Sequence, residues 1–191
     1  MKLALTAPLR AGKSEAAGYL SLYNDFHTFA FGAELKDAFH RAFPHIPRHP
    51  KPRKLYQEFG QAMRKILGED VWVNATMTKV NAYLDRHKCD CGGGLAPMLK
   101  NRVLIEDCRQ PNEYNRLRSE GFTIVRITAP EALRIERARK AGDDFDLAAL
   151  KHPTELALLN FEVDYEITND GTINELYAKM DALMEDLGVS V

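Results

Sequence analysis

The chain has 191 residues, of which 45% are hydrophobic and 28% are charged, and its formal net charge is −1. This composition is typical of a soluble globular protein, and the balanced charge gives no overall attraction to nucleic acid or to an anionic membrane. The three cysteines, an odd number, do not suggest a disulfide framework. No apolar run approaches the length of a transmembrane helix, and a strand rather than a secretory leader opens the sequence. We therefore expect one domain, residues 1–191, in the cytoplasm, without nucleic-acid or membrane partners.

The first 23 residues predict a strand, a phosphate-binding loop and a helix. Residues 3–5 are apolar, and residues 12–23 have a helical pattern. The start of this helical pattern overlaps Ala11-Gly12-Lys13-Ser14, the C-terminal half of a P-loop. In such a loop, backbone N–H groups converge on phosphate oxygens, the lysine reaches the β- and γ-phosphates, and the hydroxyl serves a phosphate-bound Mg²⁺. We predict that nucleotide phosphates are bound by Arg10, Ala11, Gly12, Lys13 and Ser14.

One position departs from the motif. Ala7, followed by Pro8, occupies the place of its first glycine. Alanine fits there only if the backbone keeps an ordinary φ/ψ conformation. The alternative is a chance Gly-Lys-Ser at the start of a helix, but the order of strand, loop and helix favours a P-loop. The loop by itself indicates a nucleotide phosphate and no particular reaction.

The next segment predicts a short strand and then helices. Residues 27–31 have strand character and are ended by Gly32, and helical spacing extends from 33 to 42. Residues 43–52 contain four prolines and predict an irregular loop. The basic residues around this loop are more simply explained as solvated charges than as phosphate contacts. Helices are then expected over 55–67 and over 72–84.

The helix expected over 55–67 carries an apolar and a polar stripe. The polar stripe consists of Gln57, Gln61 and Arg64, and Gly60 lies beside it. Glycine inside a helix costs about 1 kcal/mol relative to alanine. Two explanations stay open: another group must approach the backbone closely, or Gly60 is a packing residue behind an exposed polar face. The apolar stripe consists of Leu55, Phe59, Met63, Ile66 and Leu67.

Residues 87–101 are rich in glycine and begin with His87-x-Cys89-x-Cys91. Structural zinc sites generally use two separated ligand pairs, and the sequence offers no second pair. We therefore predict a flexible surface loop, with the role of Cys89 and Cys91 left open.

The second half of the chain alternates strands and helices. The strand at 102–107 ends in Glu106 and Asp107, where P-loop proteins place an acid beside Mg²⁺ and the γ-phosphate. Further strands are expected at 122–127 and 163–167, with helices from Pro111 to Gly121 and from Pro130 to Gly142. A last helix begins with a capping box and is apolar on one face. The pattern predicts a three-layer α/β/α fold with a parallel sheet of about five strands. The capping box consists of Thr172 and Glu175, and the apolar face of Ile173, Leu176, Tyr177, Met180, Leu183, Met184 and Leu187.

Several of these motifs, in this order, resemble the deoxynucleoside monophosphate kinases of tailed bacteriophages, a branch of the P-loop NMP-kinase group. The most specific parts are Gln57-x-Phe59-Gly60-x-x-x-Arg64 and Asp107-x-Arg109-x-Pro111-Asn112-Glu113. The resemblance implies a P-loop kinase fold with helical NMP-binding (about 33–86) and lid (about 134–155) segments. It also implies transfer of the γ-phosphoryl group of Mg-ATP to a deoxynucleoside monophosphate, giving ADP and a dNDP. The compartment would be the host cytoplasm for a phage-encoded protein.

The resemblance also implies roles for individual residues. Lys13, Asp107, Arg109 and Arg137 would be catalytic, although the choice of lid arginine among Arg134, Arg137 and Arg139 stays open. Ser14 and Asp107 would hold Mg²⁺ through ATP. The acceptor would be bound by Lys36, Gln61, Arg64, Trp72, Arg109, Asn112 and Glu113.

Other functions are compatible with the same motifs. One is a dephospho-CoA kinase-like enzyme or another small-molecule P-loop kinase. Another is an inactive nucleotide-binding regulatory module, for which Ala7 is the only hint. Arg109 could also simply pair with Glu106 or Glu113, Lys36 could be a surface lysine, and the lid arginines could line a solvated helix face. The accepted base and the oligomeric state, a homodimer included, stay open.

Overall fold

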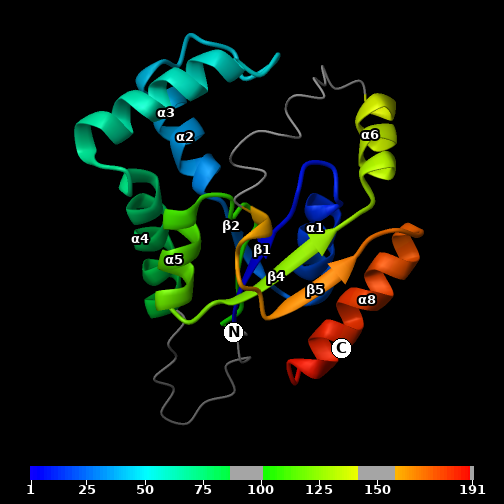
Figure 1. Cartoon of the computed structure of the whole chain (residues 1–191). Coiled ribbons are helices and arrows are strands. Elements are labelled where there is room, and N and C mark those ends of the chain that lie inside the picture. Colours follow the sequence, from blue (N-terminus) through cyan, green and yellow to red (C-terminus); the bar gives the residue numbers. More distant parts are fainter. Residues whose placement is uncertain (87–100, 142–157, 190–191) are drawn as a thin grey trace. The chain divides into compact units, whose positions relative to one another are not determined.

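The computed structural model describes residues 1–86, 101–141 and 158–189. Five strands form one sheet in the order β2-β3-β1-β4-β5 (Figure 1). The pairs β1–β3, β1–β4 and β4–β5 are parallel, which confirms the predicted α/β fold. The strands are β1 (Lys2–Thr6), β2 (His27–Phe29), β3 (Val103–Ile105), β4 (Thr123–Thr128) and β5 (Tyr165–Thr168).

The chain divides into two compact units, which we call the core unit (residues 1–28 and 102–191) and the helical unit (residues 29–101). The helical unit contains α2 (Phe31–Ala42), α3 (Arg53–Leu67) and α4 (Val71–Arg86). The core unit contains α1 (Lys13–Tyr23), α5 (Pro111–Ser119), α6 (Glu131–Lys140) and α8 (Ile173–Asp186). No helix in the described ranges is both long and apolar enough to span a bilayer.

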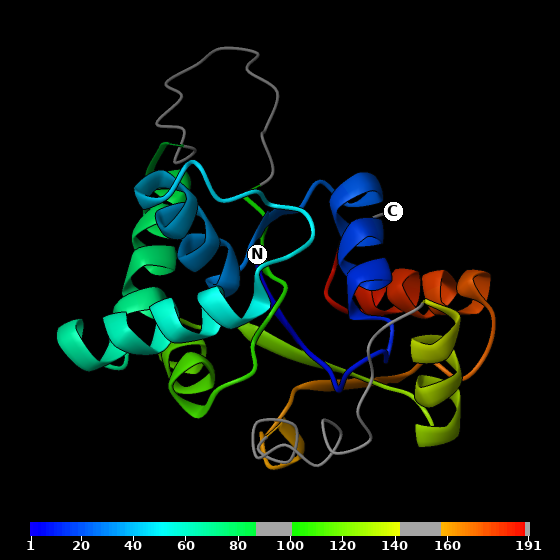
Figure 2. The ribbon, with the colours of Figure 1, turned by 90° about the horizontal axis from the view of Figure 1, so that it is seen from above.

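The sheet of the core unit is buried on both faces because its strands are apolar at successive positions. Leu3 and Leu5 of β1 face the layer formed by α1 and α8, while Ala4 between them is equally buried on the opposite side. Figure 2 shows α1 and α8 on one side of the strands and α5 on the other. Residues that pack in the first layer include Ala16, Leu20, Leu104, Val125, Ile127, Met180 and Met184.

The parallel register brings the ends of neighbouring strands to one edge of the sheet. Ala4 of β1 is opposite Ile105 of β3 and Ile124 of β4. The Cys108 N–H donates to the Leu5 carbonyl over 3.2 Å, so the segment after β3 runs beside the end of β1. The loop that follows β1 therefore lies next to the residues that follow β3.

The residues just before and just after the helical unit are hydrogen-bonded to each other within the core unit. The His27 N–H donates to the Arg102 carbonyl over 2.9 Å, and the Arg102 guanidinium donates to the Asn24 carbonyl over 2.8 Å. The chain therefore leaves the sheet and returns to it at adjacent positions.

Gly60 allows two neighbouring side chains to contact the backbone of α3. The Trp72 indole N–H donates to the Gly60 carbonyl over 3.3 Å, and a Cβ at residue 60 would lie 2.5 Å from Leu35 Cδ1. The close approach to the glycine backbone, the first of the two explanations, therefore occurs, and the approaching groups belong to the helical unit itself.

Several predicted boundaries and faces are wrong. β2 ends at Phe29 and α2 already begins at Phe31, so Gly32 lies within a helix instead of ending a strand. The expected apolar stripe of α3 is largely exposed because the helix packs through Gly60 and its neighbours: Leu55, Ile66 and Leu67 are 40%, 69% and 65% exposed. Ile173 is 50% exposed because it lies in the first turn of α8, ahead of the buried face.

Other expectations are confirmed or fall outside the described residues. Residues 43–52 are irregular, Pro111 opens α5, and the Thr172–Glu175 capping box is formed. The loop cysteines Cys89 and Cys91, and lid residues 142–155, lie outside the described residues.

Asp164 ties three elements of the core unit together just before β5. Its two carboxylate oxygens accept from Arg118 Nη1 over 2.8 and 2.7 Å, and Oδ2 also accepts from the Ile124 N–H over 2.7 Å. Burial by itself would raise the pKa of this carboxyl. The hydrogen bonds from Arg118 and Ile124 outweigh burial and hold the pKa below its ordinary value of 3.8.

This linkage predicts a pH-dependent effect of Asp164→Asn. A carboxyl whose pKa is lowered on folding stabilises the protein above its ordinary pKa, and the contribution disappears as the pH falls through the lowered value. We expect the variant to lose about 1 kcal/mol of unfolding free energy at neutral pH, and the difference from wild type to shrink in acid.

Urea unfolding at neutral pH and at acidic pH below the ordinary pKa of the carboxyl measures the difference in unfolding free energy between the variant and wild type. Glu58→Gln is the control, because Glu58 is exposed and forms only a 3.9 Å pair with Lys54. A constant difference across the pH range would contradict the role assigned to Asp164.

Candidate active site

The P-loop begins at the carboxyl end of β1, in the centre of the sheet. Ala7 is 3% exposed and is not among the residues with positive φ, which explains how alanine replaces the first glycine. The left-handed conformation occurs instead at Arg10 (φ 62°) and Gly12 (φ 102°), and the Ala11 N–H donates to the Pro8 carbonyl over 3.2 Å. Left-handed residues among right-handed ones turn successive N–H groups toward one concave side, which suits an anion.

The first turn of α1 continues this arrangement. Gly12 is the N-cap, and its carbonyl accepts from the Ala16 N–H over 3.1 Å. The N–H groups ahead of this bond have no helical partner, and together with the helix dipole they favour a phosphate. Ser14 lies exposed in this turn, while Ala16 and Leu20 are buried and hold the helix on the sheet.

Lys13 reaches across to the residues that follow β3. Its ammonium group donates to the Glu106 main-chain carbonyl. Burial lowers the pKa of Lys13, and the positive charge of Arg109 lowers it further, whereas the carboxylates of Asp107 and Glu106 act in the opposite direction. The predicted catalytic residues Lys13, Asp107 and Arg109 therefore lie close enough to influence one another.

Arg109 is exposed, and its guanidinium forms no hydrogen bond or ion pair with any residue in the described ranges. Among the described residues the guanidinium pairs with neither Glu106 nor Glu113, its two alternative partners, and Glu113 accepts from the main-chain N–H of Arg109 instead. The structure thus leaves this cation available at the carboxyl edge of the sheet, near Lys13.

Glu113 has a structural role at the start of α5. It is 5% exposed, and its Oε2 accepts from the N–H groups of Arg109 and Gln110 over 2.8 and 2.9 Å. Together with Gln110 it forms a capping box around Pro111 at the start of α5. This cap fixes the main chain that carries Arg109, and it could have been predicted from Gln110-x-x-Glu113. Binding of the acceptor by Glu113 and Asn112 stays a prediction.

The oxygen ligands near the loop suit a magnesium ion that arrives with a nucleotide. Within residues 1–86, 101–141 and 158–189, no three His, Cys, Asp or Glu side chains are grouped to hold a metal. The Ser14 hydroxyl and the Asp107 carboxylate are hard oxygen donors of the kind that Mg²⁺ combines with phosphate oxygens.

Cys108, between Asp107 and Arg109, is fully buried, and burial raises the pKa of its thiol well above the ordinary value.

Two of the three candidate lid arginines lie at the P-loop. Arg134 Nη1 donates to the Leu9 carbonyl over 3.4 Å, and Arg137 Nη2 donates to Asn169 Oδ1 over the same distance. Arg139 is exposed. Arg134 Nε and Arg137 Nη1 are buried atoms without a hydrogen-bond partner in the described part of the chain. The contacts of Arg134 and Arg137 and their unsatisfied donors make these two residues better candidates for the lid arginine than Arg139. A catalytic role for Arg137 stays a prediction.

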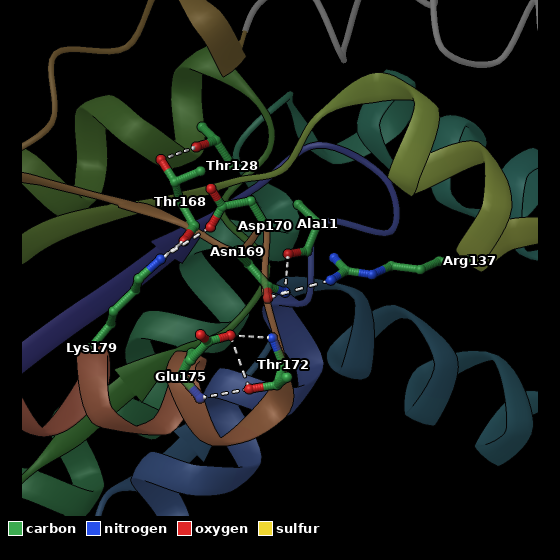
Figure 3. Close-up of polar contacts among 9 residues, drawn as sticks. All are labelled: Ala11, Thr128, Arg137, Thr168, Asn169, Asp170, Thr172, Glu175 and Lys179. Atoms are coloured by element: carbon green, nitrogen blue, oxygen red, sulfur yellow. Dashed lines mark hydrogen bonds and ion pairs between the residues drawn. The ribbon is translucent and has the colours of Figure 1, made fainter.

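Sequence reasoning missed Asn169. Its side-chain Nδ2 donates to the Ala11 carbonyl over 2.8 Å, inside the P-loop, as Figure 3 shows. The available signal was its position two residues after the strand predicted over 163–167, because the carboxyl ends of parallel strands gather at the ligand-binding edge of an open sheet.

The remaining predicted acceptor residues belong to the helical unit. Lys36 of α2 and Gln61 of α3 are exposed, and Arg64 of α3 is half-buried, with a buried Nε that has no hydrogen-bond partner among the described residues. Trp72 is 6% exposed and packs at 5.9 Å from the Phe59 ring. Trp72 therefore holds α3 and α4 together, and its contact with a substrate stays a prediction.

No family model and no curated protein matches the sequence. Solved structures share its fold at low identity. A shikimate kinase from Aquifex aeolicus vf5 aligns with a TM-score of 0.56 and 13% identity over 98% of both chains. A sugar kinase from Janibacter sp. HTCC2649 aligns with a TM-score of 0.53 and 14% identity, over 96% of this chain and 93% of that one. The Deinococcus radiodurans tunicamycin resistance protein has a TM-score of 0.52 and 14% identity, over 98% and 96%. The chain has the α/β fold of the P-loop kinases.

Proposed function

We propose that this protein transfers the γ-phosphoryl group of Mg-ATP to a deoxynucleoside monophosphate, giving ADP and a dNDP. The observation that carries the proposal is the grouping of Lys13, Asp107 and Arg109 beside a P-loop whose backbone is shaped for phosphate. A chain with a net charge of −1 has no general attraction for anions, so this local grouping needs a specific explanation.

The grouping suits phosphoryl transfer because both substrates are anions that repel each other. Such a reaction needs positioning and positive charge around the migrating group, with little covalent chemistry from the protein. Lys13 supplies charge on the donor side, and the exposed guanidinium of Arg109 offers the planar fork that grips a phosphate in two places. Mg²⁺, held by Ser14 and Asp107 together with the nucleotide, would neutralise charge on the β- and γ-phosphates.

The lowered pKa of Lys13 fits a site that is completed by its ligand. Burial and a neighbouring cation both disfavour the ammonium form in the free protein. A bound polyphosphate reverses the balance, because nearby negative charge stabilises the ammonium. The lysine is therefore held at the loop by the Glu106 carbonyl until phosphate replaces or joins that contact.

Two observations support a nucleotide as the acceptor. The motifs of α3 and of residues 107–113 resemble those of the phage deoxynucleotide kinases, and Arg64 has a buried Nε that lacks a partner among the described residues. An unsatisfied buried donor is costly, and an anionic substrate would satisfy it. Lys36 and Gln61 would complete the acceptor side.

A small-molecule kinase with another acceptor is the second candidate, because the structures that share this fold include a shikimate kinase and a sugar kinase. The two functions share the donor site and differ only in the acceptor.

The direct test is to incubate the purified protein with ATP, Mg²⁺ and each of dTMP, dGMP, dCMP, dAMP and UMP, and to measure the diphosphate formed. We expect product with at least one deoxynucleotide. Binding of ATP without product from any of them would exclude this acceptor class and favour the second candidate. A protein that binds no ATP would contradict the kinase proposal altogether.

Lys13→Ala and Arg109→Ala should each lower kcat by about 10²-fold or more, since each removes a cation that stabilises the transferring phosphoryl group. Steady-state kinetics with the preferred acceptor measures the loss, and thermal melting checks the fold. Arg86→Ala, at the exposed end of α4, should keep wild-type kcat. Near-normal turnover in either site variant would refute the assignment.

Arg64→Ala should raise the KM of the acceptor about tenfold or more while the KM of ATP stays unchanged, because it removes a charged hydrogen-bond donor from the acceptor side only. Lys65→Ala, an exposed neighbour on the same helix, is the matched control. A parallel rise in both KM values would argue against a separate acceptor role.

A further inference from the structure

The main chain on both sides of Asn169 is held by the core unit. Its N–H donates to the Thr128 carbonyl over 2.7 Å, which continues the pairing of β4 with β5 by one residue. Lys179 Nζ donates to the Thr168 carbonyl over 2.5 Å and to Asp170 Oδ1 over 3.1 Å (Figure 3). Asn169 therefore projects from a fixed backbone and is 6% exposed.

The Asn169 amide fixes the orientation of one peptide plane in the P-loop. Its Nδ2 donates to the Ala11 carbonyl over 2.8 Å. In a trans peptide the carbonyl and the following N–H point in opposite directions. When Asn169 holds the Ala11 carbonyl, the N–H of Gly12 must point away from Asn169, to the side where the proposed phosphate would bind.

Gly12 and Asn169 are sterically matched. A Cβ at residue 12 would lie 2.1 Å from Asn169 Nδ2, so the amide occupies the space that any larger residue at position 12 would need. The left-handed φ of 102° at Gly12 adds a second, independent reason for glycine.

The same amide also contacts α6. Asn169 Oδ1 accepts from Arg137 Nη2 over 3.4 Å, so one side chain donates to the loop and accepts from a lid-helix arginine. Only one orientation of the amide satisfies both partners, since the carbonyl needs a donor and the guanidinium needs an acceptor. Figure 3 shows Asn169 between Ala11 and Arg137.

We propose that Asn169 is a positioning residue for the donor nucleotide: its amide sets the direction of the Gly12 N–H in the P-loop and links that loop to Arg137. The inference rests on the proposed nucleotide-binding function and names a residue on which the phosphate affinity of the site depends.

Asn169→Asp tests the inference because it preserves shape and the contact with Arg137 but replaces the donor with a charged acceptor that faces the Ala11 carbonyl. We expect the affinity for Mg-ADP to fall about ten- to a hundredfold, measured by isothermal titration calorimetry on the full chain. The control is Asn174→Asp, the same change at an exposed position of α8, which should bind Mg-ADP as wild type does.

A comparison of ADP with AMP separates positioning of the loop from general damage. The loss should be several-fold larger for ADP, whose β-phosphate binds the loop, than for AMP. Asn169→Ala, which removes the donor without adding a charge, should show the same selectivity with a smaller loss, and it keeps the test informative if the aspartate variant does not fold.

The outcomes distinguish this inference from the proposed function. Wild-type protein that binds Mg-ADP, together with an Asn169→Asp or Asn169→Ala variant that folds and binds it equally well, would overturn the role of Asn169 and leave the kinase proposal intact. Equal losses for ADP and AMP would also overturn it. Wild-type protein that does not bind Mg-ADP would overturn both.

Discussion

The site depends on the placement of β1 between two parallel neighbours. Because β1 pairs with β3 on one side and with β4 on the other, the start of the P-loop is fixed by main-chain hydrogen bonds rather than by the loop itself. Two candidate site contacts in the core unit depend on this register: Lys13 reaches the end of β3, and Asn169 reaches the loop from the end of β5. A rigid sheet edge thus orients a short, strained segment of backbone.

The positive charges at this edge of the sheet suit the anionic nucleotide that we propose as the ligand. The positive charge of Arg109 disfavours the ammonium form of Lys13, while Arg134 and Arg137 each hold a buried nitrogen without a partner in the described part of the chain. In a free protein these features cost energy. The polyphosphate of the proposed nucleotide would relieve these costs together.

Local patterns predicted the P-loop, the five-stranded sheet and the acid at the end of β3, because each depends on neighbours in sequence. The contacts of Asn169 and Glu113 were not predicted because each depends on a partner in the folded chain. Asn169 contacts a residue 158 positions away, and Glu113 accepts from the main-chain N–H of Arg109. The exposed stripe of α3 was misjudged since periodicity shows that a helix is amphipathic without showing what covers its apolar face. The choice among the candidate lid arginines likewise required the contacts that Arg134 and Arg137 make in the folded chain.

The adjacency of Asn24, His27 and Arg102 has a consequence for how such a protein can diversify. All of the helical unit is inserted between two chain positions that are hydrogen-bonded to each other, so its length and sequence place no demand on the closure of the sheet. An insertion of this kind behaves as an exchangeable module. The core unit can stay constant while the inserted unit is replaced, and, for the function proposed above, such a replacement would be a physical route to new acceptors.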